Sequence, residues 1–159
     1  MGDVAIGYQG LGVLPRSGRL LGVDVGDVRI GLAVSDDAQL VATPLDTVPG
    51  AVDLDDVVAT IVAAAGDERA SAIVVGYPRT MQGREGSAAH RCRLVAEQVA
   101  ASADLPVLLW DERFSTVEAE RVLLDADMRR RRRRTVVDRV AASLILRGVL
   151  EAQRTSRGR

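Results

Sequence analysis

Runs of apolar residues, separated by polar and glycine-containing segments, predict five β-strands. Residues 20–25 are apolar except for one aspartate, and residues 72–75 and 107–110 are unbroken apolar runs, which is typical of strands buried on both faces. Residues 30–34 alternate between large and small side chains, as strands with one buried face do. A short edge strand is expected at 40–45. Because only turn residues separate the first two strands, they should form an antiparallel hairpin.

Segments with helical periodicity lie between and after these strands. Residues 53–65, 87–102 and 136–153 each place apolar side chains on one face, and Ser115 with Glu118 forms a capping-box pattern that opens a further helix. The order predicts an α/β fold, with a mixed five-stranded sheet and helices on both faces. The first three strands should be antiparallel and the later ones parallel.

A chain of 159 residues is expected to hold one domain. The periodic pattern covers residues 19–153, so residues 1–18 are predicted to be a flexible N-terminal arm and residues 154–159 a disordered tail. No segment has the pattern of a signal peptide or a membrane span, so a cytoplasmic protein without a membrane partner is expected.

Cysteine and histidine are too few for the common metal sites. One cysteine, Cys92, and one histidine, His90, allow neither an internal disulfide nor a Cys/His zinc site. A bound metal would therefore need oxygen ligands. Cys92 falls on the inner face of the helix at 87–102 and should be a buried thiol; if that helix is rotated, the thiol could instead form an intermolecular disulfide.

Charge is strongly segregated, although the net charge is only −1. Residues 1–127 hold 10 arginines against 20 acids, whereas residues 128–159 hold 11 arginines against two acids. Such a basic segment indicates a nucleic-acid partner, with salt-sensitive contacts to phosphates. A solvated loop is the alternative. The predicted phosphate-binding cations here are Arg129, Arg130, Arg131, Arg132, Arg133, Arg134 and Arg139.

Three carboxylates lie at the ends of predicted elements. Asp24 interrupts an apolar strand, Glu112 follows the last strand, and Asp138 lies in the first turn of the last helix. Taken singly, each also fits an ordinary role, in bonding to loop amides or in helix capping. Together they form the oxygen-ligand set that Mg²⁺ or Mn²⁺ prefers, and two such ions can assist phosphodiester hydrolysis.

Four motifs in register resemble the YqgF/RuvX family of bacterial nucleases. They are Val23-Asp24-Val25-Gly26 with Arg29-Ile30-Gly31, Val75-Gly76-Tyr77-Pro78, Asp111-Glu112-Arg113-Phe114-Ser115-Thr116, and Val137-Asp138-Arg139-Val140-Ala141-Ala142. The resemblance covers about residues 19–152. It implies an RNase H-like fold, with Asp24, Glu112 and Asp138 as metal-binding catalytic acids. Arg29, Arg79 and Arg113, which lie within or next to these motifs, are further predicted nucleic-acid contacts.

The resemblance also implies a substrate class. Members are described as Holliday junction resolvases and as nucleases that mature the 5′ end of pre-16S ribosomal RNA, so a four-way DNA junction or precursor rRNA is the expected partner. A resolvase of this size should act as a weak homodimer, because two symmetric cuts need two sites. The sequence departs from the family at Tyr77, where leucine is usual, in its arginine tract, and in residues 1–18.

Two other classes of protein share some of these features. The hairpin that contains Asp24 also resembles the phosphate-binding hairpin of actin-like ATPases and sugar kinases, but 159 residues leave no room for the second lobe of those proteins. A non-catalytic RNA-binding protein of ribosome assembly could keep the same fold. A metal-dependent cleavage assay distinguishes that protein from a nuclease.

Overall fold

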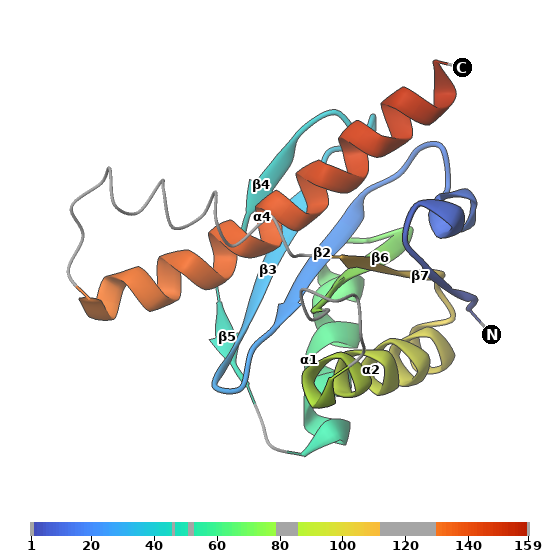
Figure 1. Ribbon diagram of the computed structural model, residues 1–159. Helices are drawn as coiled ribbons and strands as arrows, with labels where there is room; N and C mark the ends of the chain where they lie inside the picture. The colour runs from blue at the N-terminus through green and yellow to red at the C-terminus, as the bar shows by residue number, and fades with distance from the viewer. Residues whose placement is uncertain (1, 46, 51–52, 79–85, 112–129, 159) are drawn as a thin grey trace.

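The computed structural model describes residues 2–45, 47–50, 53–78, 86–111 and 130–158, and residues 130–139 by their backbone alone. The described strands form one mixed sheet with the order β1-β7-β6-β2-β3-β4, and β5 pairs with β3 (Figure 1). In chain order the elements are β1 (Val4–Ile6), the 3₁₀ helix η1 (Tyr8–Val13), β2 (Leu20–Val25), β3 (Arg29–Ser35), β4 (Ala42–Pro44), β5 (Val48–Pro49), α1 (Leu54–Asp67), β6 (Ala72–Tyr77), α2 (Ser87–Ala103), β7 (Val107–Asp111) and α4 (Arg130–Arg157).

The predicted fold class is confirmed. β2 and β3 form the expected antiparallel hairpin, from the pair Leu21–Val34 to the pair Val25–Ile30, and β4 continues it antiparallel. β6 is parallel to both of its neighbours, β2 and β7. Two short strands, β1 and β5, extend the five that were predicted. The helix expected from Ser115 lies outside the described residues.

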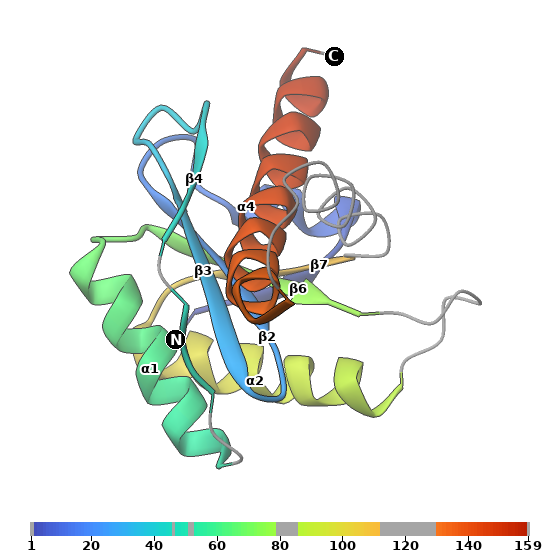
Figure 2. The ribbon, with the colours of Figure 1, turned by 90° about the vertical axis from the view of Figure 1, so that its left-hand side faces the viewer.

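Helices cover both faces of the sheet (Figure 2). On one face α1 and α2 pack on inward-facing residues such as Leu21 and Val23, and Cys92 is buried in this core, as predicted. On the other face α4 and η1 pack on a second core, which contains Leu20 of β2 and Leu108 of β7. Because side chains alternate along a strand, even-numbered residues of β2 face α4 and odd-numbered residues face α1 and α2.

The expectation of a flexible arm at residues 1–18 is wrong for most of that segment. β1 pairs with β7, and the bonds from Val107 N–H to the Asp3 carbonyl and from Gly7 N–H to the Leu109 carbonyl are both 2.8 Å. Leu14 is buried in the α4-side core. The free edge of β7 supplies the backbone hydrogen-bond partners that β1 needs. A strand of three residues is too short to show a periodic pattern, so the sequence did not predict it.

The last helix is longer than its sequence indicated. α4 begins at Arg130 instead of Val136, and it continues to Arg157, so most of the expected disordered tail is helical. Arg154 and Arg157 lie in its last turn, where positive side chains interact favourably with the helix dipole. Among the helices of the described segments, none is long and apolar enough to cross a membrane.

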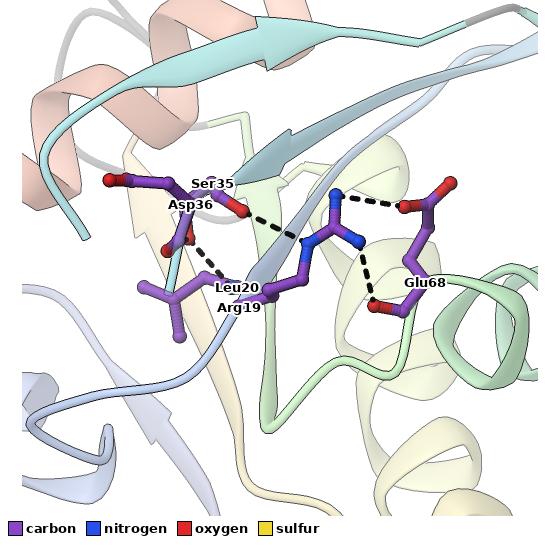
Figure 3. Close-up of polar contacts among 5 residues, drawn as sticks. All are labelled: Arg19, Leu20, Ser35, Asp36 and Glu68. Atoms are coloured by element: carbon purple, nitrogen blue, oxygen red, sulfur yellow. Dashed lines mark hydrogen bonds and ion pairs between the residues drawn. The ribbon is translucent and has the colours of Figure 1, made fainter. Parts of the chain in front are cut away.

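At the amino end of β2, one arginine links three parts of the chain (Figure 3). Arg19 forms an ion pair with Glu68, at 3.2 Å between Nη2 and Oε2, and its Nε donates to the carbonyl of Ser35 at 3.4 Å. The buried Ser35 hydroxyl accepts the N–H of Leu20 at 2.8 Å. These contacts join β2, β3 and the end of α1 at the edge of the sheet opposite the predicted acids.

The next turn is closed by a carboxylate. Asp36 Oδ1 accepts hydrogen bonds from the N–H groups of Val41, at 3.0 Å, and Leu40, at 2.7 Å. These two bonds lower the pKa of the exposed Asp36 carboxyl, because they favour its charged form. The turn between β3 and β4 is thus held by its first residue.

Helix α4 packs closely over a glycine of β2. A Cβ built on Gly22 would lie 3.0 Å from Leu146 Cβ and 3.1 Å from the Ala142 carbonyl oxygen. Both atoms belong to the body of α4 and cannot rotate away as the end of a long side chain could. The absence of a side chain at position 22 therefore sets the distance between α4 and β2.

We expect Gly22→Ala to lower the free energy of unfolding by about 1–3 kcal/mol, the usual cost of an overpacked core. Urea unfolding followed by circular dichroism measures this change. Gly66→Ala is the matched control, since a Cβ at this position in α1 meets nothing within 4 Å and alanine favours the helix. A Gly22→Ala protein as stable as the wild type would contradict the packing argument.

Candidate active site

The carboxyl ends of β2, β6 and β7 meet at one edge of the sheet, because the three strands are parallel. Val23 pairs with Val75, so the next residues, Asp24 and Gly76, lie at the same level. Gly76 in turn pairs with Trp110, one residue before the end of β7. Ligands of open α/β sheets bind beyond this edge of the sheet.

Asp24 lies on the α4 face of the sheet, in a position flanked by glycines. Leu20 and Gly22 precede it on the same face of β2, and the side chain of Asp24 is partly buried. Gly31 is its register partner on β3, and Gly76 is its neighbour on β6. Neither of these two neighbours therefore places a side chain beside the Asp24 carboxylate.

Helix α4 brings a second predicted acid to the same end of the sheet. It runs antiparallel to β2, so its amino-terminal half lies toward the end of β2 that contains Asp24 (Figures 1 and 2). Ala142 lies over Gly22, and Asp138 precedes Ala142 by one helical turn. Along β2, Asp24 lies two residues beyond Gly22. The backbone therefore places positions 24 and 138 at one end of the same interface.

The structure accounts for the other predicted site residues to different extents. Arg29 begins β3, pairs with Pro49 and is partly buried. Within the segments described, no three His, Cys, Asp or Glu side chains form a metal-binding group. Arg130, Arg131, Arg132, Arg133, Arg134 and Arg139 belong to α4, by backbone only. Glu112, Arg79, Arg113 and Arg129 lie outside the described residues.

The opposite face of this edge holds an arginine that the sequence analysis did not select. Arg93 of α2 donates from Nη2 to the hydroxyl of Tyr77 at 3.2 Å, and its guanidinium carbon lies 5.9 Å from the centre of the Tyr77 ring. Tyr77 is 1 % exposed and pairs with Asp111 on β7. The tyrosine that replaces the usual leucine thus gives Arg93 a polar and aromatic anchor. Only the position of Arg93, next to the inner residue Cys92, could have indicated this contact.

Two solved structures share this architecture at low sequence identity. The structure "T. thermophilus RuvC in complex with Holliday junction substrate" matches with a TM-score of 0.55 and 17% identity, over 86% of this chain and 96% of that one. The structure of Thermus thermophilus RuvC matches with a TM-score of 0.50 and 16% identity, over 85% and 96% of the two chains. This likeness shows the fold, which is RNase H-like as expected.

Sequence comparison extends the likeness to whole chains. A protein of Cereibacter sphaeroides named "Putative pre-16S rRNA nuclease" is 48% identical over 141 residues, which make up 89% of this chain and 88% of the relative. A protein of the same name from Roseobacter denitrificans is 44% identical over 155 residues, 92% and 91% of the two chains. The profile of the RuvX family, described as Holliday junction resolvase, matches residues 18–152. The chain therefore belongs to the RuvX family, as its four motifs had indicated.

Proposed function

We propose that this protein is a divalent-metal-dependent nuclease that hydrolyses phosphodiester bonds of structured nucleic acid. The observation that carries the proposal is the position of Asp24, a partly buried carboxylate between two glycine positions at the carboxyl end of β2. Ligands of open α/β sheets bind at this end of the strands. The family and the names of its members support the same activity.

The metal ligands in this proposal are Asp24, Glu112 and Asp138. All three supply carboxylate oxygens, which suit Mg²⁺ or Mn²⁺, and the chain has too few cysteines and histidines for a softer site. When bound, a pair of such ions supplies a nucleophilic water at neutral pH and stabilises the leaving oxygen. In this proposal β2 positions Asp24, and the phosphodiester would approach its carboxylate beside the flanking glycines.

The arginines position the substrate in this proposal. The tract at the start of α4 would contact phosphates next to Asp138, and Arg29 would contact them from the first residue of β3. Arg79, Arg113 and Arg139 complete the predicted set. Contacts of this kind hold the backbone of any sequence, so specificity would come from the shape of the nucleic acid.

Two substrates fit this chemistry, a four-way DNA junction and the 5′ end of precursor 16S rRNA. The family description favours the first, whereas the names of the relatives favour the second. They differ in the assembly that they require. Symmetric cuts in a junction need a two-fold dimer, but trimming of precursor RNA needs one active site only.

Asp24→Asn should abolish cleavage while the protein stays folded, because the amide keeps the volume of the side chain but not its charge. Loss of a residue that only hydrogen-bonds to a metal ligand typically lowers activity roughly 10–100-fold. We expect the rate of single-turnover cleavage in Mg²⁺ or Mn²⁺ to fall by more than that. The assay uses labelled junction and labelled precursor rRNA side by side, and circular dichroism checks the fold.

The control for this variant is Asp37→Asn, which neutralises an exposed carboxylate at the opposite edge of the sheet and should leave cleavage unchanged. Cleavage by Asp24→Asn at the wild-type rate would contradict the assignment of this residue. A wild-type protein that binds precursor RNA but cleaves neither substrate would indicate the non-catalytic assembly protein instead.

Replacing residues 129–134 by glutamine should weaken binding to all nucleic-acid sequences alike. Glutamine is preferred to serine because most of the tract is helical. If all six arginines contact phosphates, the slope of log affinity against log salt should flatten by about 5. Fluorescence anisotropy at several salt concentrations measures the slope. Arg154→Gln with Arg157→Gln, at the far end of α4, is the control, and an unchanged slope in the tract variant would show that the tract is only solvated.

We expect a weak homodimer in solution that does not depend on Cys92. Cys92 is 3 % exposed, so its thiol cannot reach a second chain without unfolding of α2. Sedimentation of the wild type and of Cys92→Ala, with and without reductant, measures the assembly. A strict monomer would favour the precursor RNA substrate over the junction, and a dimer seen only without reductant would contradict the burial of Cys92.

A further inference from the structure

The segment that precedes the family match adds an aromatic residue to the carboxyl edge of the sheet. Residues 2–17 lie outside the match at 18–152, yet β1 pairs with β7 up to Ile6 and Leu109. Gly7 donates to the Leu109 carbonyl at 2.8 Å and has a φ of 66°, a left-handed conformation that suits glycine. The chain turns there and enters η1 at Tyr8, on the α4 side of the sheet.

Tyr8 is held in place but remains open to solvent. Its ring centre lies 4.8 Å from that of Trp110, with an angle of 60° between the planes, an edge-to-face contact. Trp110 is 7 % exposed, whereas Tyr8 is 75 % exposed. The buried indole therefore orients the phenol ring and leaves most of its surface available to a ligand.

Trp110, which this ring contacts, lies on the same face of the sheet as the candidate catalytic carboxylate, Asp24. Trp110 pairs with Gly76, and Gly76 lies beside Asp24 at the same level of the sheet. Two strand spacings, about 10 Å, therefore separate Trp110 from Asp24. The centre of the Tyr8 ring lies 4.8 Å from that of Trp110, so Tyr8 lies within about 15 Å of Asp24. At about 3.4 Å for each stacked nucleotide, that distance corresponds to about four nucleotides.

We propose that Tyr8 stacks on an unpaired base of the nucleic acid a few nucleotides from the bond that is cleaved. The proposal rests on the proposed nuclease function and names a contact of the same site. The flat face of an aromatic ring accepts any base, and an ordered ring loses little entropy when a base stacks on it. The other aromatic side chains in the described segments, Tyr77 and Trp110, are buried, so Tyr8 is the one among them that can do this.

A single tryptophan makes the contact directly observable. Trp110 is the only tryptophan of the chain, and it touches Tyr8, so its fluorescence should change when a base covers Tyr8. The probes are an RNA hairpin with an unpaired 5′ extension of about six nucleotides, long enough to span about 15 Å, and the same hairpin without the extension. The titrations use the Asp24→Asn background, in which the RNA should stay intact.

Tyr8→Ala should weaken binding of the extended hairpin about 5–10-fold, as loss of one stacked base does, and leave binding of the blunt hairpin unchanged. Tyr8→Phe keeps the ring and should bind the extended hairpin within about twofold of the parent affinity. Leu40→Ala, which trims an exposed apolar side chain at the opposite edge, is the control and should change neither affinity. Thermal unfolding confirms that each variant is folded.

The outcomes separate this proposal from the one on which it rests. If Tyr8→Ala binds the extended hairpin as tightly as the parent does, the stacking role is wrong while the nuclease function stands. If Tyr8→Ala weakens both hairpins equally, Tyr8 supports the fold and not a base, and the proposal also fails. If the parent protein binds neither hairpin nor a four-way junction, both proposals fail together.

Discussion

The packing of α4 on β2 at Gly22 is the contact on which the candidate active site depends. A helix can approach a strand this closely only where no side chain intervenes, and Leu146 and Ala142 occupy the space that a Cβ would need. The helix contributes Asp138 and the strand contributes Asp24, each a short distance along its element from this contact. The separation of the two acidic positions is therefore set by core packing and not by loops.

Parallel strand pairing supplies the second constraint. The register of β2 and β6 places Asp24 beside Gly76. The register of β6 and β7 makes β7 end at the same edge of the sheet, and Glu112 is the next residue of the chain. Because positions 31 and 76 are glycines, the strand neighbours of Asp24 place no side chain beside it. The same register puts Trp110 in line with these residues, and Trp110 contacts Tyr8 of the N-terminal segment.

Sequence patterns predicted the elements that are long enough to show a period. The hairpin of β2 and β3, the buried strands β6 and β7 and the helices α1 and α2 all lie where the apolar pattern indicated. Strand β1 was missed, because its three residues have no period and depend on the open edge of β7. The contact of Arg93 with Tyr77 joins a helix and a strand, and no local pattern reveals such a pair. All three proposed acids were predicted from the sequence. Of the three, Asp24 is the one whose side chain lies within the described part of the structure.

We propose that Asp24, Glu112 and Asp138, which come from separate elements, bind divalent cations together. The most direct measurement is the anomalous scattering of Mn²⁺ in crystals of the wild-type protein. We expect a peak at about 2.0–2.3 Å from a carboxylate oxygen of Asp24, a usual metal–oxygen distance, with Glu112 or Asp138 as a further ligand. Ordered Mn²⁺ bound elsewhere on the protein, with none at Asp24 at saturating concentration, would contradict it.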